Sequence, residues 1–176
     1  MSRRMRWGLV ALLTAEWLAL ACWVGGLTVL IAAAIPAVFN TFGGQDSGGL
    51  FLTKAFEGYN RVVMGAVVVL VVGMVIRHGI VARRVPWLRP TRLAWVLLGI
   101  MVAIAGAIIF VMHPDAAARQ AEAFAIHEGP ARKAALEQFF KLHQPMRILY
   151  MVNWAVGVGL AAATVWPWVT RDEARG

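Results

Sequence analysis

The sequence has few of the residues on which soluble enzymes and disulfide-bonded secreted proteins depend. Its 176 residues include one cysteine, Cys22, which excludes an intrachain disulfide and a cysteine-based metal cluster. Charged residues make up 15% of the chain, against about 25% in ordinary soluble domains. No Gly-x-x-x-x-Gly-Lys phosphate loop, Gly-x-Ser-x-Gly turn or His-Glu-x-x-His metal pair occurs. These absences predict a protein that is neither a soluble domain nor an enzyme.

What the sequence does contain is apolar residues, which make up 60% of the chain and gather in four long runs. A transmembrane helix needs about 20 mostly apolar residues. The runs that qualify are residues 7–35, 59–81, 93–112 and 148–169. Because backbone groups in lipid must form hydrogen bonds within their own segment, each run is expected to be a helix. The sequence therefore predicts an all-α polytopic membrane protein, a single domain built as a bundle of four transmembrane helices.

Positive charge is concentrated on one side of these runs. The formal net charge is +8, and the excess comes from Arg3, Arg4, Arg6, Arg77, Arg83, Arg84, Arg89, Arg92, Arg171 and Arg175. Acidic and basic residues balance on the other side, so the positive-inside rule predicts cytoplasmic termini in a bacterial-type inner membrane. Anionic lipid headgroups are then a better partner than nucleic acid. Their expected contacts are Arg83, Arg84, Arg89 and Arg92.

A more polar segment, residues 113–147, precedes the last run and is expected to be helical and extracytoplasmic. Pro114 is expected to end the third span and restart a helix, since proline suits a first-turn position. Pro130 should break that helix before a second one at 131–143. Such a segment is expected to lie along the membrane interface or cap the bundle. It is either a solvated helical hairpin or a docking surface for another subunit.

Several short motifs follow one another in a characteristic order. They are Trp23-Val24-Gly25-Gly26, Pro36-Ala37-Val38-Phe39, Phe56-Glu57-Gly58-Tyr59, Phe140-Lys141-Leu142-His143 and finally Asn153. This order resembles the transmembrane protein 205-like family of four-helix membrane proteins and, more distantly, copper-resistance protein D membrane domains. The resemblance implies the same four-helix fold. That family has no agreed biochemical activity, so the resemblance supports the fold more than a function.

Two polar residues lie inside predicted spans. Glu16 is the only charge in the first run, and an ionisable group in lipid costs several kcal/mol unless it is paired or hydrated. Glu16 therefore has three possible roles: an ion pair that locks two helices, a proton or cation relay, or a contact to a partner subunit or pigment. The candidate ion-pair partners are Arg77, His78 and Arg92. Asn153 is expected to hydrogen-bond across helices.

The second run spans the bilayer only if charged groups at its ends snorkel outward, namely Arg61, Arg77 and His78. Close helix approach is expected at Gly25 and Gly26 of the first span, because small residues let backbones come together. Pro36 is expected to end or kink this helix near the outer face.

Two histidines bracket the outer segment, each with a methionine beside it. His113 follows Met112, and His143 precedes Met146 by three residues. Imidazole and thioether ligands suit Cu(I), and two histidines at equal depth suit a haem iron. The simpler interpretation is that both histidines cap or hydrogen-bond interfacial backbone. No cofactor is predicted outright, with haem and copper as the candidates.

Three functions are compatible with these features. The absence of catalytic motifs, the small size and the protruding outer segment favour a non-enzymatic accessory or scaffolding subunit of a larger membrane complex. The first alternative is a small-solute or metal-ion permease or resistance protein that uses Glu16 and the two histidines. The second alternative is a haem-binding membrane anchor of a redox chain.

Overall fold

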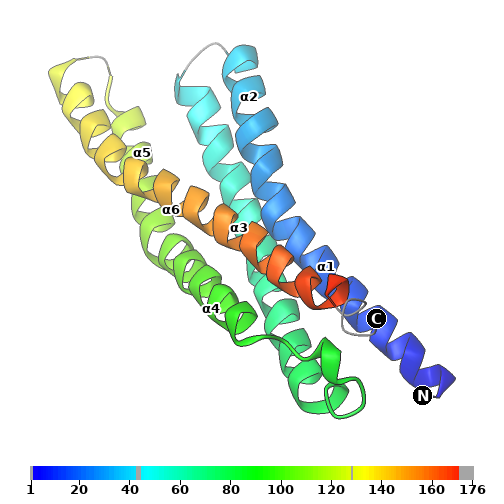
Figure 1. The fold of residues 1–176 in the computed structure, drawn as a ribbon. Helices are drawn as coiled ribbons and strands as arrows, with labels where there is room; N and C mark the ends of the chain where they lie inside the picture. The colour runs from blue at the N-terminus through cyan, green and yellow to red at the C-terminus, as the bar shows by residue number, and fades with distance from the viewer. Residues whose placement is uncertain (1, 43–44, 128, 171–176) are drawn as a thin grey trace.

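The computed structural model describes residues 2–42, 45–127 and 129–170, which form four long helical rods (Figure 1). The elements are α1 (Arg3–Val29), η1 (Leu30–Ala34), α2 (Ile35–Phe42), α3 (Gln45–Ile76), η2 (Arg77–Val81), η3 (Pro86–Leu88), α4 (Arg92–Ala107), η4 (Ile108–Met112), α5 (His113–Ala125) and α6 (Pro130–Val169). The rods are Arg3–Phe42, Asp46–Val81, Pro86–Ala125 and Pro130–Val169, and each is apolar enough to cross a membrane. The prediction of an all-α bundle of four such helices is confirmed.

The rods are much longer than a bilayer requires. Three of them contain 40 residues and the other contains 36. At 1.5 Å per residue a 40-residue helix is about 60 Å long, about twice the ~30 Å hydrocarbon core. Large apolar side chains such as Leu18, Val68 and Phe110 are exposed along the rods, as contact with lipid requires. The chain is thus an integral membrane protein whose helices extend beyond the bilayer.

Two rods contain a π-helical turn that ends two residues before a proline. These turns are η1, before Pro36, and η4, before Pro114. A proline ring normally clashes with the carbonyl four residues earlier and breaks the helix. In η1 the backbone hydrogen bonds reach back five residues and not four, since Ile35 N–H donates to Leu30 O. A new α-helix does begin at His113 with Pro114 in its first turn, as predicted. Neither proline ends its rod, however, so Pro36 does not end the first helix and Pro114 does not end the third, since both rods continue through the proline.

The fourth rod is one helix that includes both outer and membrane-spanning residues. α6 contains Pro145 and Pro167 without interruption, and it begins after Gly129. Gly129 has a φ of 148°, which side chains disfavour, so glycine permits the sharp change of direction before Pro130. The expected break at Pro130 is confirmed. The outer segment is not a separate interfacial or capping piece, because α5 and α6 simply prolong the spans.

The ends of the rods farthest from the start of α1 and the end of α6 form two hairpins (Figure 1), and these are the ends that the sequence predicts to be extracytoplasmic. The first hairpin, called α2/α3, consists of α2 and the first half of α3. The second, called α5/α6, consists of α5 and the first half of α6. At the opposite end of the bundle lie the start of α1, the connection from η2 to α4 and the end of α6. The ring of Trp17 packs edge-on against that of Trp168 there, with centroids 6.2 Å apart, which joins α1 to α6.

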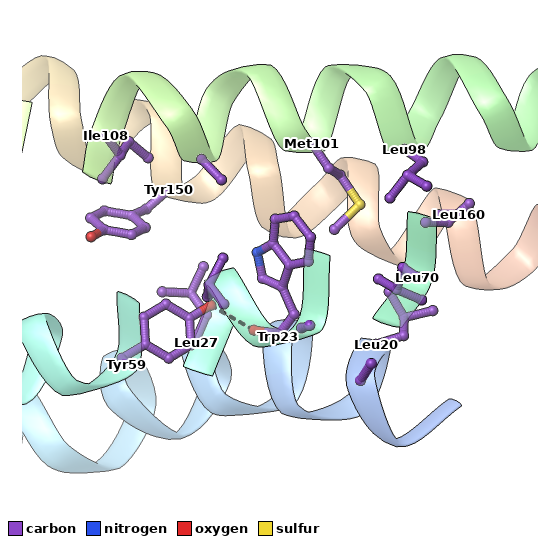
Figure 2. Packing of buried hydrophobic residues seen from close by; sticks show 14 of the residues in the cluster. Leu20, Trp23, Leu27, Tyr59, Leu70, Leu98, Met101, Ile108, Tyr150 and Leu160 are labelled. Carbon is purple, nitrogen blue, oxygen red and sulfur yellow. Dashed lines mark hydrogen bonds between the residues drawn. The ribbon is translucent and has the colours of Figure 1, made fainter. Parts of the chain in front are cut away.

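The core lies where the four rods meet. Figure 2 shows the indole of Trp23 reaching from α1 toward Met101 of α4, and both side chains are buried. The Tyr59 hydroxyl donates a 2.6 Å hydrogen bond to Trp23 O, which joins α3 to α1 (Figure 2). In lipid, helices associate through packing and hydrogen bonds rather than through the hydrophobic effect. These contacts therefore hold α1, α3 and α4 together at the centre of the bundle.

Candidate functional site

An ion pair between α1 and η2 is buried in the interior. Arg77 Nε lies 3.1 Å from Glu16 Oε2, and the two side chains are 5% and 7% exposed. Of the other two candidate partners of Glu16, His78 is exposed, with Nε2 3.2 Å from Arg89 Nη2, and Arg92 is also exposed. The expectation that Arg77 snorkels outward is wrong, because its pairing with Glu16 holds the guanidinium inside the bundle.

Gly73 on α3 provides the space for the Glu16 side chain. A Cβ atom built on Gly73 would lie 2.7 Å from Glu16 Cγ and 2.8 Å from Glu16 Cδ, too close for carbon atoms. Arg77 follows Gly73 by one helical turn, so the same rod supplies both room and counter-charge. Glu16 Oε1 makes no hydrogen bond to any described residue. The geometry is that of an enclosed, charge-balanced link between α1 and the second rod.

A second set of buried polar groups links α6 to its neighbours. Asn153 Nδ2 donates to Met101 O at 3.4 Å, and the Tyr150 hydroxyl donates to Asn60 Oδ1 at 3.3 Å. Both hydrogen bonds are long. Asn153 Oδ1 and Asn60 Nδ2 make no hydrogen bond within the described part of the chain. Because these amides are only partly satisfied, their net contribution to stability is small.

A cavity of about 490 Å³, called the outer cavity, lies between the two hairpins. Its lining side chains come from η1, α2, α3, α5 and α6. Most of them are apolar, including Phe39, Leu52, Phe56, Phe124 and Leu136. Towards the core the cavity is bounded by residues such as Met146 and Tyr150, which are buried members of the central cluster. The cavity is therefore a feature of the outer half of the molecule.

Two polar contacts tie the hairpins together, one between residues that line the cavity and one beyond it. The Thr53 hydroxyl of α3 donates a hydrogen bond to Gln120 Oε1 of α5. Arg132 of α6 forms an ion pair with Asp46 of α3. Gly49 makes room for the first contact, because a Cβ there would lie 2.7 Å from Gln120 Nε2. These contacts fix the separation of the hairpins and hence the width of the cavity.

Three of the four residues considered for copper or haem line the outer cavity. They are His113, His143 and Met146, whereas Met112 packs against the core cluster. The His143 ring stacks on Phe139 with centroids 5.2 Å apart, and its buried Nδ1 has no hydrogen-bond partner among the described residues. In the part of the chain that the structure describes, no three His, Cys, Asp or Glu side chains are grouped so that they could hold a metal ion.

The remaining predicted residues lie apart from the cavity. A Cβ on Gly26 would lie 3.1 Å from Tyr59 Cε2, so this glycine does accommodate a neighbouring rod, whereas a Cβ on Gly25 would meet nothing within 4 Å. Pro36 is exposed on α2. The predicted lipid contacts are exposed around the connection from η2 to α4, at the end opposite the cavity: Arg83, Arg84, Arg89 and Arg92.

Several residues that shape these sites were not predicted from the sequence. Gly73 is a lone glycine in an apolar run, and its only signal is its position one turn before Arg77. Thr53 and Gln120 lie outside the predicted spans, and Asn60 lies at the start of the second one. Each has a charged neighbour in the sequence, so its local pattern is that of an ordinary helix end. None of them belongs to a recognisable motif.

Comparison with known proteins gives one family. Residues 18–125, more than half of the chain, match the model described as "Domain of unknown function (DUF4149)". The matched region runs from α1 to the end of α5 and includes Gly73 and Arg77, but it begins just after Glu16 and excludes α6. No curated protein and no solved structure matches the chain. This chain therefore belongs to the DUF4149 family.

Proposed function

We propose that this protein is a non-enzymatic accessory subunit that associates with a larger membrane complex through its outer hairpins. The observation that carries the proposal is the exposure of aromatic side chains beyond the predicted spans. At the end of hairpin α2/α3, Phe42 and Phe51 are 48% and 50% exposed, with ring centroids 5.8 Å apart. Exposed apolar clusters of this kind mark protein interaction surfaces.

The proposal includes a bacterial-type inner membrane and cytoplasmic termini. It is supported by the arginines at one end of the bundle, which include Arg3, Arg4, Arg83 and Arg84. Arg171 and Arg175, counted on the same side, lie outside the described residues. The charges of Arg77 and Glu16 cancel in their ion pair. The other arginines at this end therefore keep their excess positive charge, as the positive-inside rule requires of a cytoplasmic face. Anionic lipid headgroups are the proposed partner of that surface.

Two alternatives have weaker support. A permease that uses Glu16 as a relay would need the carboxylate to change partners, whereas it is enclosed by Arg77 and Gly73. Haem or Cu(I) binding would use His113 and His143, whose shared lining of one cavity is the observation in its favour. An absorption spectrum and metal analysis of protein purified from its native membrane test that alternative. A relationship of this family to the transmembrane protein 205-like proteins is likewise proposed from the order of the sequence motifs.

Purification from the native membrane in a mild detergent tests the association. The protein is expected to elute with other subunits in stoichiometric amounts. The double variant Phe42→Asn/Phe51→Asn should elute alone, because polar side chains remove the aromatic surface without touching the core. A double variant of exposed neighbours on the same hairpin, Thr41→Asn/Ser47→Asn, should keep its partners. If the wild-type chain is monodisperse and alone in the native extract, the proposal is wrong.

The orientation is tested separately by cysteine labelling in intact cells. In a Cys22→Ser background, Arg84→Cys should react with a membrane-impermeant maleimide only after the cells are opened. Ser47→Cys, at the other end of the molecule, should react in intact cells. The opposite pattern would place the arginines outside and contradict the proposed topology.

A further inference from the structure

The outer cavity has the size and lining of a site for a small amphiphile. Its volume of about 490 Å³ falls within the range of about 300–1,000 Å³ that small-molecule sites occupy. Aromatic and aliphatic side chains from both hairpins form most of the wall, among them Phe39, Leu52, Phe124 and Leu136. An apolar ligand body would therefore find contacts on several sides.

The side chains on the wall of the cavity that can carry a charge near neutral pH are all basic. His113, His143 and Arg147 line it, and no aspartate or glutamate does so among the described residues. Arg147 is exposed and forms no ion pair or hydrogen bond within the described part of the chain. A guanidinium without a counter-ion beside an apolar space favours a ligand that carries a negative charge.

His143 supplies a second unsatisfied polar group at the same place. Its Nδ1 is buried and has no hydrogen-bond partner among the described residues, although the ring is held by stacking on Phe139. A buried polar atom without a partner costs free energy. Since Nδ1 has no accessible surface, a ligand in the cavity reaches it only after a rotation of the ring. Arg147 follows His143 by four residues on α6, so the two side chains lie on the same face of that helix.

The position of Arg147 relative to the bilayer indicates how the ligand is arranged. Arg147 directly precedes the span predicted at 148–169, so it lies at the outer boundary of the hydrocarbon. Phe124 and Leu136 lie on the parts of α5 and α6 that extend away from the membrane. The opposite wall, with Ile31, Ile35, Tyr150 and Met151, belongs to the predicted spans, so only an acyl chain that runs from Arg147 toward Phe124 and Leu136 is held outside the bilayer. A two-chain phospholipid placed there would leave its second chain in water, which is unfavourable.

We infer that the outer cavity binds a long-chain fatty acid, with the carboxylate at Arg147 and His143 and the acyl chain among the apolar side chains of the two hairpins. A carboxylate matches the paired donors of a guanidinium. The inference does not depend on the proposed association with other subunits, which uses the outward-facing aromatic residues.

Photo-crosslinking of the full-length protein in phosphatidylcholine nanodiscs tests the inference. The probe is palmitate with a diazirine in the middle of its chain, and adducts are mapped by mass spectrometry. Adducts are expected on cavity-lining residues such as Phe124 and Leu136. Unlabelled palmitate should suppress them, and hexadecanol, which has the same chain without the charge, should be about tenfold less effective.

Variants separate the charge from the apolar space. Arg147→Gln should lower the yield of cavity adducts about tenfold, because it removes the counter-charge. Lys141→Gln is the matched control, since Lys141 is an exposed cation on the same helix that does not line the cavity. Ala117→Trp should abolish the adducts by filling the space. Monodisperse elution of each variant shows that it is folded.

Three results would overturn the inference. Adducts spread over lipid-facing residues such as Val68, without enrichment in the cavity, would show that the probe reports only bilayer lipid. Equal competition by hexadecanol would remove the role of the charge, and this comparison needs only the wild-type protein. Cavity adducts from a diazirine-labelled phosphatidic acid at the same yield would replace the fatty acid with a two-chain lipid.

Discussion

The contact between Gly73 and Glu16 predicts that the cost of one substitution depends on the residue at another position. In Gly73→Ala, the new Cβ would lie 2.7 Å from Glu16 Cγ and 2.8 Å from Cδ. Carbon atoms pack at about 3.5–4.0 Å, so the glutamate side chain must move by about 1 Å. Overpacking of this kind costs about 1–3 kcal/mol. The displacement also stretches the 3.1 Å contact with Arg77, which adds to the loss.

The same substitution should cost nothing when Glu16 is shortened. Glu16→Ala removes the Cγ, Cδ and carboxylate atoms, so the Cβ of Gly73→Ala finds open space. Alanine also favours helix over glycine by up to about 1 kcal/mol. A double-mutant cycle should therefore give a coupling energy of about 1–3 kcal/mol. Glu16→Ala is itself expected to destabilise the protein by about 3–5 kcal/mol, because it leaves the Arg77 charge buried and unpaired.

Reversible unfolding by SDS in mixed micelles, followed by tryptophan fluorescence, measures the free energy of unfolding of all four proteins. Gly65→Ala on the same helix is the control, since a Cβ at Gly65 would lie more than 4 Å from any neighbouring side chain or helix. It should be neutral or slightly stabilising in both backgrounds. If Gly73→Ala costs the same whether or not Glu16 is present, the carboxylate does not lie against α3, and the argument for the enclosed pair fails.

Three further substitutions and one control can be measured by the same unfolding assay. Tyr59→Phe should cost about 0.5–1.5 kcal/mol, because it removes the 2.6 Å hydrogen bond to Trp23 O; a larger loss would mean that the hydroxyl has a further role. Asn153→Leu should change stability by less than about 1 kcal/mol, since its single long hydrogen bond leaves Oδ1 unsatisfied, and a larger loss would contradict that interpretation. Gly26→Ala should cost about 1 kcal/mol through contact with the Tyr59 ring, whereas Gly25→Ala, in open space, should be neutral.

The number and type of helices could be predicted because lipid imposes strict conditions on sequence. Backbone groups without water must be satisfied internally, so each long apolar run had to be a helix. The true length of the rods could not be predicted in the same way. Pro36, Pro114 and Pro145 are breaking signals in local terms, yet the helix continues through all three. The first two follow π-helical turns, in which the hydrogen bonds span five residues and the helix can pass the proline. A proline in the sequence does not reveal whether the helix ends or adopts such a turn.

The candidate sites were likewise predictable only in part from the sequence. A single charge in an apolar run marks Glu16 regardless of the fold, because burial of an unpaired carboxylate is costly. The choice of Arg77 over His78 or Arg92 depends on the register between two rods, which hydropathy does not specify. The outer cavity depends on the separation of the hairpins, and this is fixed by contacts such as that between Thr53 and Gln120, 67 residues apart in sequence.

The two ends of the bundle differ in a way that bears on function. At the end with the arginines, the rods are joined by the Glu16–Arg77 pair and the contact between Trp17 and Trp168. At the other end, the hairpins enclose a cavity that meets the buried core at Tyr150. Between the two ends, close-packed side chains fill the centre around Met101. A solute crossing this bundle would have to displace the packed centre, which costs several kcal/mol for each large side chain removed from its contacts. This asymmetry is the structural reason for which we propose that the protein holds a molecule or a partner at the end with the hairpins and does not move a solute across the membrane.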